Sequence, residues 1–241
     1  MKSYGIYAKY YPLLIKYVDF EPIAEYVMEI FDMFNGNISD IYDFGCGTGH
    51  LGHLLSKKYN VIGYDISNTM LENAIKEFKG KKIQFAVRDL TKKQNFKEVD
   101  AVLALGDVIN HIIDDRDLEV FFDNVYRALK SNGIFIFDIN SPHEIRENMA
   151  VKVEDKIENV LFKWEGIVDK DNIASFNVEF EENNNVYKDT LKEKIYTIDD
   201  ILNNLKARFE LNAIYGDYSF EKPIPNDERY VFVCRKKEAN F

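Results

Sequence analysis

The chain has 241 residues, of which 46% are hydrophobic and 30% are charged, which is typical of a folded globular protein and excludes a disordered or fibrous chain. The formal net charge of -10 argues against nucleic acid as a partner, because binding to phosphate backbones needs a surplus of Lys and Arg. No apolar stretch has the length of a membrane span or the pattern of a signal peptide, and only Cys46 and Cys234 are present. We therefore expect a cytoplasmic protein without disulfides, and we expect no membrane association.

Short apolar runs alternate with helical patterns in the first 140 residues. This alternation is typical of a parallel sheet built from repeated βαβ units. The five expected strands are Ile41–Phe44, Val61–Tyr64, Ile83–Val87, Ala101–Leu105 and Ile134–Ile139.

The helices of this region are marked by apolar spacing and by residues that begin or end a helix. Polar N-caps precede the first turn, and Gly or Asn in a left-handed conformation follows the last. The expected helices are Pro22–Phe34 with Asn35-Gly36 as its end, a helix capped by Ser67 and ended by Gly80, and a helix over 118–129 that stops at Asn132-Gly133.

The pattern changes after Pro142, where Ala174, Phe176, Val178 and Phe180 alternate with polar residues. A period of two indicates half-buried strands. Residues 160–168 also look extended, and Asn183-Asn184-Asn185 is a turn. We expect one or two aromatic residues of this region to contact a substrate and the others to be sheet core; the aromatic residues are Phe162, Trp164, Phe176, Phe180 and Tyr187.

Beyond this region, Thr197 is positioned to cap a helix that extends through Arg208, and Phe209–Tyr218 and Arg229–Arg235 are expected as the last two strands. The predicted fold is α/β, with a Rossmann-like, seven-stranded, mainly parallel sheet formed by residues 1–140 and 198–241. Residues 141–197 are expected to form a small antiparallel β subdomain inserted after the fifth strand.

Glycines stand at every second position in Asp43-Phe44-Gly45-Cys46-Gly47-Thr48-Gly49, directly after the first strand and before a helical stretch. Glycine lets the backbone turn sharply and lets a ligand approach closely, while the helix that follows offers unpaired N–H groups. The small side chain of Cys46 fits such a turn. A dinucleotide fingerprint would need a further glycine at position 50, where His50 stands, so an NAD-dependent oxidoreductase is a less favoured alternative.

Two acidic residues follow the next two strands. Asp65 stands at the end of the second strand, where a carboxylate can accept hydrogen bonds from both ribose hydroxyls, and Asp89 follows the third strand. With Asp43, they line the carboxyl ends of adjacent strands, which is where open α/β sheets bind ligands.

The segments 41–49, 63–67 and 88–90 resemble successive motifs of class I S-adenosylmethionine-dependent methyltransferases, and the resemblance spans most of residues 38–140. Within that superfamily the chain resembles small bacterial and archaeal enzymes that begin with a Tyr-rich segment like Tyr4–Tyr11 and insert an antiparallel sheet after the fifth strand. The resemblance implies S-adenosylmethionine as cofactor and S-adenosylhomocysteine as product.

The resemblance also implies roles for single residues. Gly45 and Gly47 would lie under the methionine moiety, whose amino end Asp43 would organise, and Asp65 would hold the ribose. The remaining cofactor contacts would come from Ile66 and Met70 beside the adenine, Asp89 and Leu90 at its polar edge, Tyr11 as a cover, and Cys46 and Leu105 beside the methionine moiety.

In the resembled family the loop from Leu105 to His111 passes beside the sulfonium and faces the methyl acceptor. Positioning alone supplies about 7–11 kcal/mol in well-oriented reactions, so no base is obligatory. If a proton must leave the acceptor, His111 or Asp107 is the candidate, since an ordinary histidine has a pKa near ~6.5. The alternative for His111 is a helix-start or surface position without a chemical role.

We therefore predict an enzyme that methylates a nitrogen or oxygen atom of a small molecule, or less favourably a protein side chain. The alternative from another class is a non-catalytic protein that binds S-adenosylmethionine and holds a partner chain with its inserted sheet. No group of His, Cys and Asp shows metal-ligand spacing along the chain, so no metal is expected.

Overall fold

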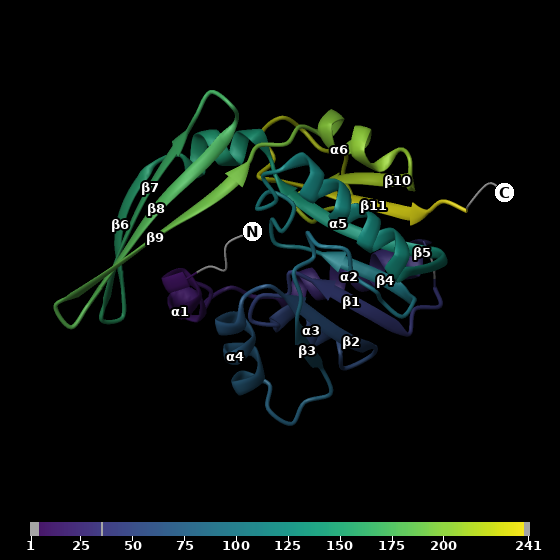
Figure 1. Ribbon diagram of the computed structural model, residues 1–241, viewed down its shortest axis with the longest axis horizontal. Coiled ribbons are helices and arrows are strands. Elements are labelled where there is room, and N and C mark those ends of the chain that lie inside the picture. Colours follow the sequence, from purple (N-terminus) through teal and green to yellow (C-terminus); the bar gives the residue numbers. More distant parts are fainter. Residues whose placement is uncertain (1–4, 35, 239–241) are drawn as a thin grey trace.

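Seven strands form the central sheet of the computed structural model, which describes residues 5–34 and 36–238 (Figure 1). Their order is β10-β11-β5-β4-β1-β2-β3, in which β1 to β5 pair in parallel and β11 runs antiparallel to both of its neighbours. This confirms the predicted Rossmann-like, mainly parallel sheet. The strands are β1 (Asp40–Phe44), β2 (Asn60–Asp65), β3 (Gln84–Val87), β4 (Val99–Ala104), β5 (Leu129–Asn140), β10 (Phe209–Gly216) and β11 (Arg229–Lys236).

Helices cover both faces of this sheet, because successive side chains of a strand point to opposite sides. Ile41 of β1 packs in one core with helices α2 (Glu21–Phe34) and α3 (His50–Leu55). Tyr42 and Phe44 point the other way and pack with α5 and α6. The remaining helices of the sheet layer are α4 (Asn68–Glu77), α5 (Asp115–Ala128) and α6 (Ile198–Leu205).

A second sheet of four antiparallel strands follows β5 and a short π-helix (Glu144–Met149). It projects away from the central sheet (Figure 1). Asn183 and Asn184 both have positive φ in its last turn, as expected for a tight hairpin. The insertion of an antiparallel sheet after the fifth strand is thus confirmed. Its strands are β6 (Lys152–Ile157), β7 (Val160–Val168), β8 (Ile173–Glu182) and β9 (Asn185–Lys194).

The N-terminal helix α1 (Gly5–Leu14), which the sequence pattern did not predict as a helix, lies between the two sheets (Figure 1). Asn73 of α4 donates a hydrogen bond to the carbonyl of Ala8, with 3.2 Å between the heavy atoms. On the other side, the Tyr7 N–H donates to Asp189 of β9 at 3.0 Å. Helix α1 therefore connects the inserted sheet to helix α4. Tyr4, the first residue of the Tyr-rich segment, lies outside the described residues.

Several predicted element ends are wrong by a few residues. Helix α5 ends at Ala128, and β5 already begins at Leu129, where its pairing with β4 shifts register. Only Asn132 of the predicted stop has positive φ (60°), so it forms an irregularity inside the strand and not the end of the helix. The other differences are that α6 ends at Leu205 instead of Arg208 and that β10 ends at Gly216 instead of Tyr218.

Two predicted helix caps are confirmed. Ser67 is the N-cap of α4 and accepts a hydrogen bond from the Met70 N–H at 3.3 Å. Thr197 forms a capping box with Asp200 at the start of α6. Asn35, predicted to end α2, lies outside the described residues. Within residues 5–34 and 36–238, no helix is both long and apolar enough to cross a membrane.

Candidate functional site

The glycine-rich turn adopts a backbone that side chains would obstruct. Gly45 and Gly47 have φ of 75° and 53°, in the left-handed region that favours glycine. A Cβ atom at Gly45 would lie 2.5 Å from a methyl carbon of Val108, whereas one at Gly47 would meet nothing nearer than Tyr11, at 3.9 Å. The turn therefore packs tightly at Gly45 and borders open space at Gly47.

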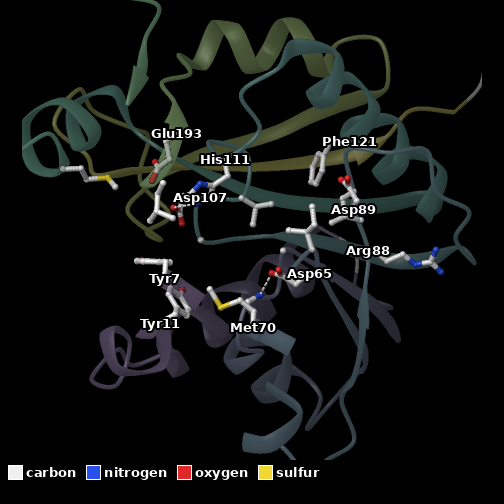
Figure 2. Close-up of a pocket in the computed structure, with 18 of the residues that line it drawn as sticks. Tyr7, Tyr11, Asp65, Met70, Arg88, Asp89, Asp107, His111, Phe121 and Glu193 are labelled. Carbon is white, nitrogen blue, oxygen red and sulfur yellow. Dashed lines mark hydrogen bonds and ion pairs between the residues drawn. The ribbon is translucent and has the colours of Figure 1, made fainter. Parts of the chain in front are cut away.

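Asp65 holds this turn in place. Its carboxylate, only 5% exposed, accepts hydrogen bonds from the N–H groups of Gly47 at 2.9 Å and Ser67 at 2.8 Å. Burial raises the pKa of Asp65, and the two backbone hydrogen bonds oppose that rise. Asp65 thus joins the glycine turn to the start of α4, and it lines the cavity above them (Figure 2).

Asp43 lies beneath the turn and is 3% exposed. Burial, with the charge of Asp65 as a second cause, raises its pKa to about 7. One of its oxygens packs against α3, where a Cβ at Gly52 would lie 3.0 Å away. Asp43 is therefore a carboxylate whose charge a nearby cation would stabilise.

Asp89, after β3, uses one carboxylate oxygen locally. This oxygen accepts hydrogen bonds from the N–H and the hydroxyl of Thr91, at 3.0 and 2.6 Å. The residue is half-buried and lines the same cavity as Leu90 and Met70. Asp89 therefore orders its own turn and also faces the cavity.

Two cavities adjoin at Tyr11, Gly45, Gly47 and Gly106, which line both of them. The larger has a volume of about 220 Å³ and the smaller about 100 Å³. Every residue that the sequence predicted for the site lines at least one of the two, and Figure 2 shows the larger. The larger is lined by Tyr11, Asp65, Ile66, Met70, Asp89, Leu90, Asp107 and His111, and the smaller by Asp43, Cys46 and Leu105, in addition to the glycines.

Cys46 owes its place to packing. Its sulfur lies next to Gly63, where an added Cβ atom would be only 2.7 Å from the sulfur. The absence of a side chain at Gly63 therefore leaves the room that the thiol fills. Burial raises the pKa of this thiol, which keeps it protonated and unreactive.

The loop after β4 is fixed by a carboxylate that the sequence analysis missed. Asp138 of β5 is fully buried and accepts hydrogen bonds from the N–H groups of Gly106 at 3.0 Å and Asp107 at 2.8 Å. Both loop residues have positive φ. Arg229 of β11 pairs with Asp138 at 3.1 Å, and the Tyr218 hydroxyl donates to it as well. This network presents the Asp107 side chain to the larger cavity.

Asp107 and His111 form an ion pair inside the cavity, with 3.3 Å between the Asp107 oxygen and His111 Nε2. The other ring nitrogen, Nδ1, lies 3.2 Å from the carbonyl oxygen of Lys192, to which a protonated Nδ1 donates. Burial lowers the pKa of His111, but the hydrogen bond and charge of Asp107, together with Glu193, raise it to about 9. His111 is therefore positively charged at neutral pH, which makes it a poor base there.

Glu193 of the inserted sheet completes this end of the cavity (Figure 2). It is 2% exposed and accepts a hydrogen bond from Asn140 Nδ2 at 3.1 Å. Burial and the charge of Asp107 raise its pKa to about 7, while His111 lowers it.

Asn110 brings these residues together. Its side-chain oxygen accepts from the Asn140 N–H at 2.9 Å, and its amide donates to the Lys194 carbonyl at 3.1 Å. Its own carbonyl accepts from the Lys194 N–H at 2.7 Å. The ends of β5 and β9 are thus joined to the loop that carries Asp107 and His111.

Asp107, His111 and Glu193 each place one potential ligand atom within 4.8 Å of the others. Three such groups are the smallest set that usually holds a divalent ion. However, His111 Nε2 is directed at Asp107 as an ion pair, and a metal would have to replace its proton. The expectation that the protein has no metal stays a prediction.

Sequence reasoning also missed several other residues that line the larger cavity, among them Tyr7 and Met149. Of the aromatic residues of the insertion, Trp164 lines the cavity, whereas Phe176 and Phe180 are fully buried in sheet cores. A signal for Glu193 was present: it stands in phase with Leu191 and Ile195 in a segment of period two, and so on the inward face.

Three comparisons with known proteins agree with this geometry. Residues 41–133 match the sequence family described as a methyltransferase domain. YqeM of Bacillus subtilis, named as a candidate methyltransferase, is 27% identical over 209 residues, covering 83% of this chain and 85% of YqeM.

Among solved structures, an S-adenosylmethionine-dependent methyltransferase from Clostridium acetobutylicum is similar with a TM-score of 0.85 and 27% identity, covering 94% of this chain and 96% of that chain. CalS10 from Micromonospora echinaspora, an amino pentose methyltransferase with S-adenosylmethionine bound, has a TM-score of 0.76 over 98% of this chain and 99% of its own. Its identity of 14% means that this likeness concerns the fold alone.

Proposed function

We propose that the chain acts as a class I S-adenosylmethionine-dependent methyltransferase, which transfers the methyl group to a nitrogen or oxygen atom of a small molecule and releases S-adenosylhomocysteine. The observation that carries the proposal is the junction of the two cavities at Gly45, Gly47 and Gly106. A ligand that extends from the smaller cavity into the larger passes directly beside Asp107.

The residues at this junction fit the cofactor. A Cβ at Gly106 would meet nothing within 4 Å and one at Gly47 nothing nearer than 3.9 Å, so both backbones border space that an elongated ligand can fill. In our assignment the Asp65 carboxylate, which keeps lone pairs beyond its two backbone hydrogen bonds, accepts from the ribose hydroxyls. The side chains of Ile66 and Met70 then flank the adenine.

The smaller cavity suits the methionine end. Asp43 and Tyr11 line it, together with the turn residues Cys46 and Gly47. A buried carboxylate whose pKa is raised to about 7 gains most from a cationic neighbour, and the ammonium of an amino acid is such a group. We assign Asp43 to this ammonium, and we assign Asp89 and Leu90 to the adenine edge.

When bound, the cofactor supplies a methyl group that is already electrophilic, so this chain's residues mainly hold and orient the acceptor. Asp138 fixes the loop N–H groups of Gly106 and Asp107, which sets the position of the Asp107 carboxylate. Asp107 and His111, whose side chains form an ion pair at 3.3 Å, provide charged groups where we place the methyl acceptor.

We further propose that residues 141–197 form the acceptor-binding subdomain, while residues 1–140 and 198–241 bind the cofactor. Met149, Trp164, Leu191 and Glu193 all come from the inserted segment and line the larger cavity opposite the glycine turn. A small-molecule acceptor is supported by the modest volume of the larger cavity, about 220 Å³.

The test is methylation profiling with the purified protein, isotope-labelled S-adenosylmethionine and a metabolite extract. We expect label in one or a few small molecules, and S-adenosylhomocysteine in equal amount. A protein that binds the cofactor but labels only polypeptides would contradict the small-molecule proposal.

A further inference from the structure

The larger cavity has a polar end that the cofactor assignment does not use. It is formed by Asp107, His111 and Glu193, with Tyr7 near them (Figure 2). Trp164 lines the same cavity, and we call these five residues the acceptor end. They come from α1, the loop after β4 and two strands of the inserted sheet. The assembly of one polar chamber from four segments indicates a binding site.

The acceptor end carries a surplus of negative charge. Asp107 and protonated His111 neutralise each other as an ion pair, and Arg229 behind the cavity is paired with Asp138 in the same way, so the Glu193 carboxylate is the charge of this group that no cation matches one to one. The other cationic side chain that lines the cavity, Arg88, lies at the adenine side and donates to Gln94 at 2.8 Å. Figure 2 shows Arg88 far from Glu193. An anionic acceptor would therefore find repulsion here, and a cationic one attraction.

Glu193 is also much less exposed to solvent than a carboxylate in a surface ion pair. It is 2% exposed, beside Leu191 and Met149, which line the same wall. It accepts a hydrogen bond from the neutral amide of Asn140. Burying a carboxylate is costly unless a charge or several donors compensate it, so the fold maintains this group at a cost that a bound cation would offset.

We propose that the methyl acceptor is an amine that binds as an ammonium ion between the carboxylates of Asp107 and Glu193. This inference rests on the proposed function and narrows its acceptor to the nitrogen class. The aromatic side chains of Tyr7 and Trp164 line the same cavity. Trp164 is held in orientation by its Nε1–H, which donates to the Met149 carbonyl at 2.8 Å.

The same geometry assigns the proton. The bound ammonium gives one proton to a Glu193 oxygen, and the freed nitrogen lone pair forms the bond to the methyl carbon. The electron pair of the broken carbon–sulfur bond stays on sulfur, and the methylated nitrogen carries the positive charge that sulfur loses. Glu193 is thereby a catalytic residue, whereas Asn140 positions it.

The test uses the single tryptophan of the chain, Trp164, as a reporter. The protein is saturated with S-adenosylhomocysteine in buffer with EDTA and titrated with benzylamine, benzyl alcohol and benzoate while the tryptophan fluorescence is followed. We expect benzylamine to bind about tenfold or more tightly than benzyl alcohol, and benzoate to bind most weakly, because only the amine complements the carboxylates. Equal or tighter binding of the alcohol or of benzoate would overturn the proposal.

Variants then locate the selectivity. Glu193→Gln should reduce the preference for benzylamine to about threefold or less, while the affinity for S-adenosylhomocysteine stays within about a factor of two. The matched control is Glu165→Gln in the same sheet, whose side chain is 52% exposed, and which should keep the full preference. A folded Glu193→Gln variant that keeps the preference would refute the role of Glu193. If this variant does not fold, the affinities of the three probes for the unmodified protein still decide whether the acceptor end prefers an amine.

A metal would show itself in the same experiment. If benzylamine selectivity is absent in EDTA and appears only on addition of Mn²⁺ or Zn²⁺, the ammonium site is wrong. Failure of the proposed function looks different: the protein would then bind S-adenosylhomocysteine and benzylamine but transfer no label to any small molecule.

Discussion

Replacing Asp65 by alanine should weaken cofactor binding and the fold together, and the two effects can be separated. The variant loses the carboxylate that we assign to the ribose hydroxyls. Hydrogen bonds to a charged group contribute about 1.5–3 kcal/mol, which corresponds to a dissociation constant about 10- to 150-fold higher. Calorimetric titration with S-adenosylhomocysteine measures this change directly.

The stability loss follows from the two N–H groups that Asp65 accepts, those of Gly47 at 2.9 Å and Ser67 at 2.8 Å. Each buried donor left without an acceptor costs about 1–3 kcal/mol, so the free energy of unfolding should fall by about 2–6 kcal/mol. We expect the lower half of that range, because burial already raises the pKa of Asp65 and its removal relieves part of that cost. Urea unfolding measures the difference.

Asp100 provides a matched control at the opposite end of the sheet. Its carboxylate accepts from the backbone N–H groups of Ser39 at 3.0 Å and Asp40 at 2.9 Å. Asp100 also pairs with Lys130 at 2.7 Å, so Asp100→Ala should lose some stability but bind S-adenosylhomocysteine normally. The reasoning is refuted if folded Asp65→Ala binds within a factor of two of the unmodified protein, or if Asp100→Ala loses affinity as well.

Three further predictions concern the support of the site. Gly45→Ala would place a carbon 2.5 Å from a valine methyl group. It should therefore destabilise the protein by about 1–3 kcal/mol more than Gly80→Ala, because Gly80 has a similar φ (77°) but borders open space. Equal losses of stability in urea unfolding would argue against this. Asp138→Ala leaves the guanidinium of Arg229 without its carboxylate and should lower the free energy of unfolding by about 3–5 kcal/mol. Adding Arg229→Met should recover part of this loss. If the effects of the two substitutions simply add, Asp138 and Arg229 are not coupled. Because the pKa of Asp43 rises to about 7, its protonation favours the folded state. This contribution to stability is present below about pH 4 and is lost as pH rises through about 7. Asp43→Asn should flatten this part of the profile of stability against pH, and an unchanged slope would count against the raised pKa.

The cofactor half of the site could be predicted because its signals are local in the sequence. Asp43, Asp65 and Asp89 each follow a strand whose apolar run is visible, and parallel strands bring their carboxyl ends to one edge of the sheet. The structure adds that two of these carboxylates also hold backbone: Asp65 accepts from the glycine turn, and Asp89 accepts from Thr91. The sequence pattern predicts where these residues lie, but the hydrogen bonds that they accept from the backbone depend on atomic distances that the pattern does not contain.

Helix α1 could not be predicted in the same way. It contains Pro12, which normally argues against a helix interior, and its stability comes from contacts at a distance in sequence. Tyr10 stacks on Phe180 of β8 with 4.3 Å between ring centroids, and the Tyr7 N–H bonds to Asp189. Tertiary packing here overrides local propensity, so the Tyr-rich segment was visible while its helical form was not.

The acceptor end shows why the remaining chemistry stayed hidden. In the sequence Lys192-Glu193-Lys194 reads as a solvated charged run, yet the period of the strand places Glu193 inward with Leu191, and it is 2% exposed. What turns that inward position into a site is Asn110, whose side chain bonds to the ends of both β5 and β9 and so sets Glu193 against Asp107. These contacts join three segments that are far apart in the chain, and none leaves a repeat or spacing. It follows that the strands of the insertion can change the acceptor while the glycine turn and Asp65 keep the cofactor, which is the division of labour that the Glu193 and Asp65 variants probe separately.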